Sequence, residues 1–322
     1  MTLNRRTLLG SSLALGLSPY VHAKTSWPDR PLRIIVPYGP GGSSDIIARA
    51  ISQPLAEALG QSVIVENRAG ANGNLGADPV AKSAPDGNTM LLCDTGALAI
   101  SPSVYTKLSF DPIKDLRGVT MLAYSPHMLV VHPSVKVDNL KELVALSKTS
   151  DLNFAVTAIG SAPHLAGVAV ERANGAKWVY VPYKGGAQAI ADTVAGQTQV
   201  LMNGMLATLP HVQSGKLKVL GISKRTRMPL IGTVPTLAEQ GMPGFESGTW
   251  QGVLVANGTP PAILARLNAE LIKAIRTTDV RARLSGQGAE VVTMTPVEQD
   301  QFLNRERIRW AQVVAAANIK LD

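Results

Sequence analysis

The sequence predicts an α/β protein of two lobes, in which mostly parallel sheets carry helices on both faces. Short apolar runs alternate with segments of helical periodicity, the pattern of successive strand–helix–strand units. The sequence of residues 36–42 also recurs, one residue shorter, at 181–186, each time between a strand and a helix. The 322 residues are enough for about two domains.

The first 23 residues are predicted to be an export signal. Arg5 and Arg6 are followed by an apolar run at 8–17 and by small residues at 21–23, the usual order in such signals. The run is too short for a spanning helix, which needs about 20 apolar residues. A buried N-terminal helix is the alternative, but it would not need that order. The arginine pair also resembles a twin-arginine signal, and both export routes lead to a periplasm.

Composition excludes several functions. A formal charge of +8 without a dense basic stripe argues against a nucleic-acid partner. A single cysteine, Cys93, excludes an internal disulfide and a cysteine-rich metal site. The five histidines lack the spacing of a helical metal site, so we expect neither metal nor cofactor.

In the first third of the chain, strands are predicted at 32–36, 62–66 and 89–93. A helix follows the first strand, with Ser43 and Ser44 expected to cap it, Asp45 in its first turn and Gly60 at its end. A glycine-rich loop at 67–76 leads into a helix that reaches about residue 82.

The rest of the chain continues the alternation. Strands are expected at 152–157, 179–181, 199–202 and 250–256. Helices are expected at 137–148, 188–195, 262–276, 280–284 and 296–317. A polar stretch with several Pro and Gly at 233–249 separates the middle of the chain from its last part.

Four loops stand out because each follows a predicted strand: residues 37–44, 94–97, 160–164 and 182–186. Backbone N–H groups at a helix start, with the positive end of the helix dipole, bind anions. The carboxyl ends of parallel strands are where α/β proteins place ligands. Each loop alone is better explained as a simple strand-to-helix turn, but the four together favour an anion site.

No catalytic residue is predicted. The chain has neither a Gly-x-Ser-x-Gly elbow nor a phosphate-binding Gly-x-x-x-x-Gly-Lys-Ser/Thr loop. Ser161 and His164 share one short loop without an orienting acid, so His164 is interpreted as a capping or ligand-contacting residue. The alternative function is an exported dinucleotide-dependent oxidoreductase, in which Gly39-x-Gly41 would hold pyrophosphate and Glu66 the ribose.

Seven segments together resemble the Bug receptors, the periplasmic solute-binding proteins of tripartite tricarboxylate transporters. The matching segments are PxRPxRIIVP (28–37), GGxxD (41–45), VENRxGAxGN (65–74), APDG (84–87), HLAG (164–167), VPYKG (181–185) and VPTLAE (234–239). The resemblance implies a type II-like periplasmic binding protein fold, hinged around a central cleft that closes on a small organic acid without chemistry. It also implies that loop 37–45 grips a ligand carboxylate, and that residues 95–96 and 160–161 complete the cleft.

The expected ligand-binding residues combine the loop residues with those implied by the resemblance. They are Pro37, Tyr38, Gly41, Gly42, Ser43, Asp45, Thr95, Gly96, Gly160, Ser161, Ala162, His164, Tyr183 and Asn203. The family often has Asp where this chain has Asn203. Because an acid there would pair with a ligand ammonium, we expect a ligand without an amino group, a di- or tricarboxylate or an aromatic acid.

The lobes are expected at 24–124 plus 249–322 and at 125–248. The hinge would then lie where the chain crosses, near 123–125 and 248–250. The expected partners are the organic acid and the membrane subunits of a tripartite transporter or a sensor. We expect the protein to be a monomer.

Overall fold

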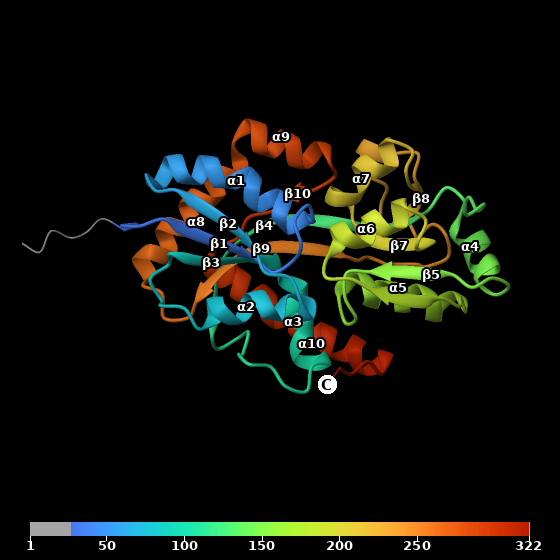
Figure 1. Ribbon diagram of the computed structural model, residues 1–322, viewed down its shortest axis with the longest axis horizontal. Coiled ribbons are helices and arrows are strands. Elements are labelled where there is room, and N and C mark those ends of the chain that lie inside the picture. Colours follow the sequence, from blue (N-terminus) through green and yellow to red (C-terminus); the bar gives the residue numbers. More distant parts are fainter. Residues whose placement is uncertain (1–26, 322) are drawn as a thin grey trace, which may run out of the picture.

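The computed structural model describes residues 27–321, so the predicted export signal lies outside the described residues (Figure 1). The strands are β1 (Leu32–Val36), β2 (Val63–Asn67), β3 (Thr89–Asp94), β4 (Leu116–Val131), β5 (Asn153–Val156), β6 (Val179–Pro182), β7 (Val200–Gly204), β8 (Lys218–Ile222), β9 (Gly248–Ala256) and β10 (Glu290–Val291). The α-helices are α1 (Ser43–Leu59), α2 (Asn74–Ala81), α3 (Thr95–Val104), α4 (Leu140–Ser147), α5 (Ala162–Asn174), α6 (Gly186–Val194), α7 (Met205–Gln213), α8 (Pro261–Arg276), α9 (Thr278–Gly286) and α10 (Pro296–Ala317). Short 3₁₀ turns lie at η1 (Ala71–Gly73) and η2 (Pro229–Ile231).

The strands form a mixed sheet in the order β2-β1-β3-β9-β4-β7-β5-β6, with β8 and β10 also paired to β4. Within each half the predicted parallel pairing is found: β1 lies between β2 and β3, and β5 between β6 and β7. The two halves are joined by antiparallel strands, because β4 leads out of the first half and β9 leads back into it.

The 16-residue strand β4 was not predicted, and it decides how the halves are connected. As far as Pro126 it pairs with β9, and from His127 onward with β7. Near this change of partner Tyr124 lies opposite Trp250 and Ser125 opposite Thr249. Residues 123–125 and 248–250, where the sequence predicts the chain crossings, therefore belong to neighbouring, hydrogen-bonded strands.

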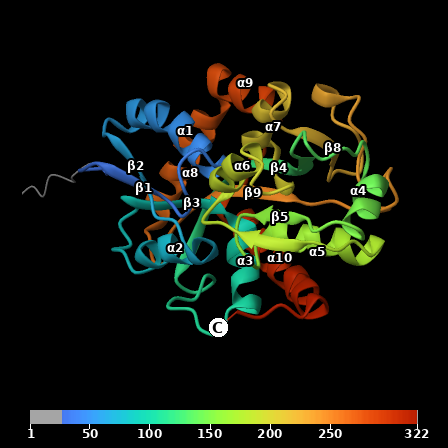
Figure 2. The same ribbon diagram turned by 45° about the vertical axis from the view of Figure 1, so that its right-hand side comes forward.

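Helices cover both faces of each half, as predicted (Figures 1 and 2). In the first half, α1 and α8 pack on one face, and α2, α3 and α10 cover the other. In the second half, α4 and α5 pack opposite α6 and α7. A separate apolar cluster joins α3 and α10 of the first half to α5 of the second. In the described part of the chain, no helix is long and apolar enough to span a bilayer.

Some helix starts differ from the prediction, each for a local reason. The N-cap residue of α1 is Gly42, and neither Ser43 nor Ser44 caps the helix through its side chain. α4 begins at Leu140, not 137, because the side chain of Asn139 accepts the N–H of Glu142. α3 begins immediately after β3, so residues 94–97 form a helix start with no intervening loop.

Candidate functional site

Residues from all four predicted loops line one pocket between the two halves of the sheet, which we call the cleft pocket. Its volume is about 40 Å³, room for roughly three water-sized groups. Its lining residues are polar or small: Tyr38, Gly42, Ser43, Ser44, Asn72, Asp94, Thr157, Ser161, Gly186, Asn203, Thr249 and Gln251. Among these lining residues none is basic, and Asp94 is the single acid.

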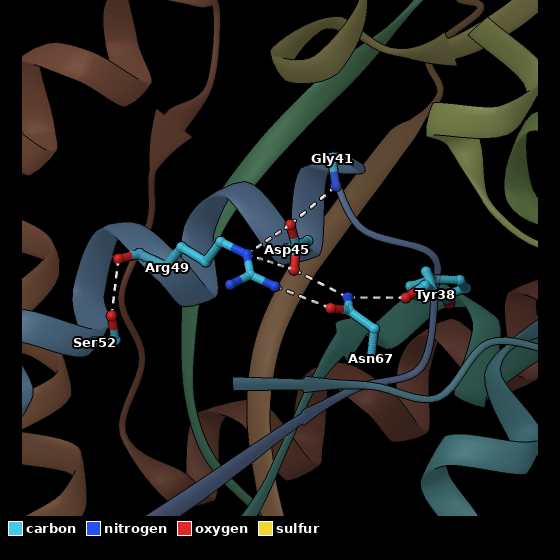
Figure 3. A network of polar contacts seen from close by, with 6 residues as sticks. All are labelled: Tyr38, Gly41, Asp45, Arg49, Ser52 and Asn67. Atoms are coloured by element: carbon cyan, nitrogen blue, oxygen red, sulfur yellow. Dashed lines mark hydrogen bonds and ion pairs between the residues drawn. The ribbon is translucent and has the colours of Figure 1, made fainter. Parts of the chain in front are cut away.

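The loop between β1 and α1 is held in shape from outside the pocket, by a polar network around Asp45 (Figure 3). The carboxylate of Asp45 accepts the N–H of Gly41 at 2.9 Å, Nε of Arg49 at 3.0 Å and Nδ2 of Asn67 at 2.9 Å. Asn67 also donates to the carbonyl of Tyr38 at 3.1 Å. Burial disfavours the charged form, but these hydrogen bonds outweigh it and lower the pKa of Asp45. Asp45 therefore positions the loop.

The two glycine loops that resemble one another in sequence meet across the pocket. The N–H of Gly39 donates to the carbonyl of Lys184 at 3.4 Å. Gly185 has φ +141°, and a Cβ there would lie 3.1 Å from the nitrogen of Gly39. Glycine is thus required at 185 both by the backbone conformation and by the close approach of the loops.

Several helices begin at this pocket, and N–H groups in the first turn of a helix have no partner within the helix. α1 follows Gly42, α6 begins at Gly186, and α5 is capped by Ser161, whose Oγ accepts the N–H of His164 at 3.3 Å. The positive ends of these helix dipoles favour an anion in a site without basic side chains.

His164 supports the Gly160 turn and does not line the pocket. Its Nδ1 accepts the N–H of Gly160 at 3.1 Å, and its ring packs edge-on against Tyr180. Burial lowers the pKa of His164 to about 4, which keeps the imidazole neutral and able to accept this bond. The capping interpretation fits these contacts.

Asp94 is the charged group of the pocket, and it is 8% exposed. It caps α3, and its Oδ1 accepts the N–H of Gly96 at 3.0 Å and that of Trp250 at 3.3 Å. Burial raises the pKa of Asp94 to about 7, with a smaller contribution from the charge of Glu306, although the two backbone bonds oppose the shift. A carboxyl that titrates near neutrality therefore lines the pocket.

The structure brings some predicted site residues together and places others elsewhere. The predicted residues that line the cleft pocket are Tyr38, Gly42, Ser43, Ser161 and Asn203. Three more lie behind it: Pro37 packs against Gly76, Gly41 donates to Asp45, and the carbonyl of Gly160 accepts Nδ2 of Asn72 at 3.2 Å. Ala162 packs between α3 and α10, and Thr95 is the first residue of α3.

The remaining predicted residues line other pockets. Tyr183 lines a neighbouring cavity of about 200 Å³ that shares Tyr38, Asn72 and Thr157 with the cleft pocket. Gly96 lines a cavity of about 300 Å³ beside Trp250.

Sequence reasoning missed several lining residues. Thr249 and Gln251 come from β9, which was predicted only from residue 250 and without a ligand role. Asn72 comes from the 67–76 loop, whose glycines were the available signal. Thr157 lies at the end of β5, within the predicted strand.

The geometry gives little support to the alternative function, a dinucleotide-dependent oxidoreductase. The carboxylate of Glu66 is paired with Arg33 and with Arg68 and does not line the cleft pocket. Among residues 27–321, no group of three or more His, Cys, Asp or Glu side chains is placed to hold a metal ion.

A two-lobed α/β fold, with crossing strands at its centre and a polar pocket between the lobes, defines the periplasmic solute-binding proteins. One of these is BugD, whose structure superposes with a TM-score of 0.88 at 29% identity, over 92% of this chain and all of that one. The chain belongs to the tripartite tricarboxylate transporter receptor family, whose model matches residues 47–319.

Two relatives show more closely which periplasmic solute-binding proteins this chain resembles. BugT of Bordetella pertussis is 38% identical over 95% of this chain and 94% of its own length. MatC of Rhodopseudomonas palustris, solved with bound malate, superposes with a TM-score of 0.85 at 33% identity, over 89% of this chain and all of that one. The chain is therefore a Bug-type receptor of this family, as its sequence motifs predicted.

Proposed function

We propose that the cleft pocket is where this receptor captures a small organic acid. The observation that carries the proposal is the convergence of the starts of α1, α5 and α6 on a pocket without basic side chains. N–H groups and helix dipoles bind a carboxylate there without the desolvation of a fixed ion pair. Ser43 and Thr157 add hydroxyl groups to the lining.

The lobes are proposed to comprise residues 24–124 with 249–322 and residues 125–248. The paired crossings at Tyr124–Trp250 and Ser125–Thr249 support a hinge at this place, because two strands then carry all the relative motion. Closure brings the loops of Gly39 and Lys184 together over the ligand. Closed lobes offer a membrane partner a surface that open lobes do not.

The protein is proposed to act without chemistry, as a monomer, in a periplasm. It would deliver its ligand to the membrane subunits of a tripartite transporter, and a sensor is the alternative recipient. The twin-arginine motif supports export in the folded state.

Native mass spectrometry of freshly purified protein tests capture, because a closed cleft retains its ligand. We expect a bound mass of a small organic acid, and calorimetry with malate, succinate, citrate and benzoate should find at least one tight binder. Gly42→Val places a branched side chain in the pocket and should weaken that binder by at least tenfold while the fold is kept. Equal affinity in Gly42→Val would contradict the pocket assignment.

Binding of NAD tests the alternative function, that of an exported oxidoreductase. An exported oxidoreductase would bind NAD, and fluorescence titration of the purified protein should show it. We expect no binding, because the one acid suited to a ribose, Glu66, is engaged with two arginines.

A further inference from the structure

One side of the cleft pocket presents hydrogen-bond acceptors. Asp94 on β3 and Gln251 on β9 are directly paired in the antiparallel register, so their side chains lie next to each other on one face. Both line the cleft pocket, and they are 8% and 1% exposed. This side differs from the side where α1, α5 and α6 begin.

The orientation of the Gln251 amide follows from its neighbour. Thr249 Oγ1 donates to the carbonyl of Ser125 at 3.4 Å, so it can only accept from Gln251, whose Nε2 lies 2.8 Å away. Oε1 of Gln251 is then left as a buried oxygen that accepts no hydrogen bond from the described residues. An unpaired buried acceptor costs about 1–3 kcal/mol, which a donor in the pocket would recover.

Asp94 adds a second acceptor beside Gln251. The backbone N–H groups of Gly96 and Trp250 both donate to its Oδ1, so neither of them occupies Oδ2. No pocket-lining side chain is basic, so a donor on the ligand is a suitable partner for this carboxyl.

We propose that Asp94 and Gln251 form an acceptor subsite that selects ligands carrying a hydrogen-bond donor, a hydroxyl or an ammonium, on the carbon next to the bound carboxylate. The pocket is small, about 40 Å³, so a donor that reaches these acceptors has to lie close to the bound carboxylate. Ligands of this class are α-hydroxy and α-amino acids. The inference rests on the proposed function and extends it to ligand choice.

The residue Asn203 does not determine whether the donor on the ligand is a hydroxyl or an ammonium. It lacks a charge, but Asp94 supplies an acid to the same pocket from another strand. A hydroxyl would satisfy the acceptors, and an ammonium would also neutralise the carboxylate.

Calorimetry with matched ligand pairs tests the subsite in the full-length mature protein. Malate is compared with succinate and lactate with propionate for the hydroxyl, and aspartate with succinate for the ammonium. We expect the donor-bearing member of at least one kind of pair to bind at least tenfold more tightly. Asp94→Asn, which turns an amide donor toward the ligand, and Gln251→Met, which removes Oε1, should each reduce that ratio at least fivefold.

Asp78→Asn is the matched control, because Asp78 is an acid on α2 that bonds Lys82 and Ser109 outside the pocket. It should leave the ratio unchanged. Equal affinities within every pair, or a ratio that survives both pocket variants, would overturn the inference while leaving carboxylate capture intact. Absence of binding by every acid would overturn the proposed function and the inference with it.

Discussion

The guanidinium of Arg172 on α5 donates a hydrogen bond of 2.9 Å to the carbonyl of Ala317, the last residue of α10. A second N–H of the same group donates to the carbonyl of Ala316. Arg172 thus places a positive charge at the negative end of a helix from the other half of the molecule, beside the apolar cluster of α3, α5 and α10.

Arg172→Met should lower the free energy of unfolding by about 1 kcal/mol, because two C-terminal carbonyls lose their donor and the helix end loses its counter-charge. Thermal denaturation would show this as a fall in Tm of about 2–4 °C. Arg266→Met is the control, since Arg266 has a half-exposed side chain that pairs with Glu270 one turn away within α8. A Tm for Arg172→Met that matches the control would contradict the role of this contact.

Gly185→Ala should weaken ligand binding by at least tenfold. The new Cβ would lie 3.1 Å from the nitrogen of Gly39, so the two glycine loops could not approach each other as closely. Gly241→Ala is a matched control: Gly241 also has positive φ, +101°, but open space around its Cβ position. Both variants should lose about 1 kcal/mol of stability from backbone strain, and calorimetry should find lower affinity only for Gly185→Ala.

Asp45→Asn tests the positioning network. The amide cannot accept from Gly41, Arg49 and Asn67 together, so we expect a loss of about 1–3 kcal/mol in denaturant unfolding and weaker binding through a loosened loop. Asp138→Asn, which alters an exposed acid paired with Lys218, should change neither quantity measurably. Unaltered stability in Asp45→Asn would show that the loop holds its shape without this carboxylate.

Stability should depend on pH through Asp94. Its pKa is about 7 in the folded protein and near 3.8 when unfolded, so between these values the folded state binds the extra proton. The contribution of Asp94 is complete below about pH 4 and is lost as pH rises to about 7, by about 1.4 kcal/mol per pH unit at most. The charged and titratable groups near it are Glu306, Tyr38 and Cys93.

Two buried histidines change the stability with pH in the direction opposite to Asp94. Burial lowers the pKa of His164 to about 4 and that of His127 to about 3, so their contribution is lost as pH falls below about 6.5. Unfolding of the wild type and of Asp94→Asn across pH 4–8 separates the effects. The difference between the two proteins should slope only between pH 4 and 7, and a difference independent of pH would contradict the raised pKa of Asp94.

The sequence by itself determined the local elements and the family. β1 and α10 lie where predicted, and Gly60 ends α1 in the left-handed conformation, because apolar period and glycine punctuation are local signals. The motifs identified the receptor family, and the four loops identified the region of the pocket.

The tertiary structure decided how these parts meet. β4 was missed because Ser125, Pro126 and His127 break its apolar pattern, although each finds a partner once β9, β7 and β8 lie alongside. Asp45 lies in the first turn of α1 and Asp94 is the last residue of β3, so both stand where a strand gives way to a helix. The side chain of Asp45 bonds Arg49 and Asn67 outside the pocket. Asp94 lies in the pocket opposite Gln251. The direction of a side chain at a strand end depends on neighbours that are remote in sequence. The residues proposed to select the ligand could therefore be recognised only in three dimensions.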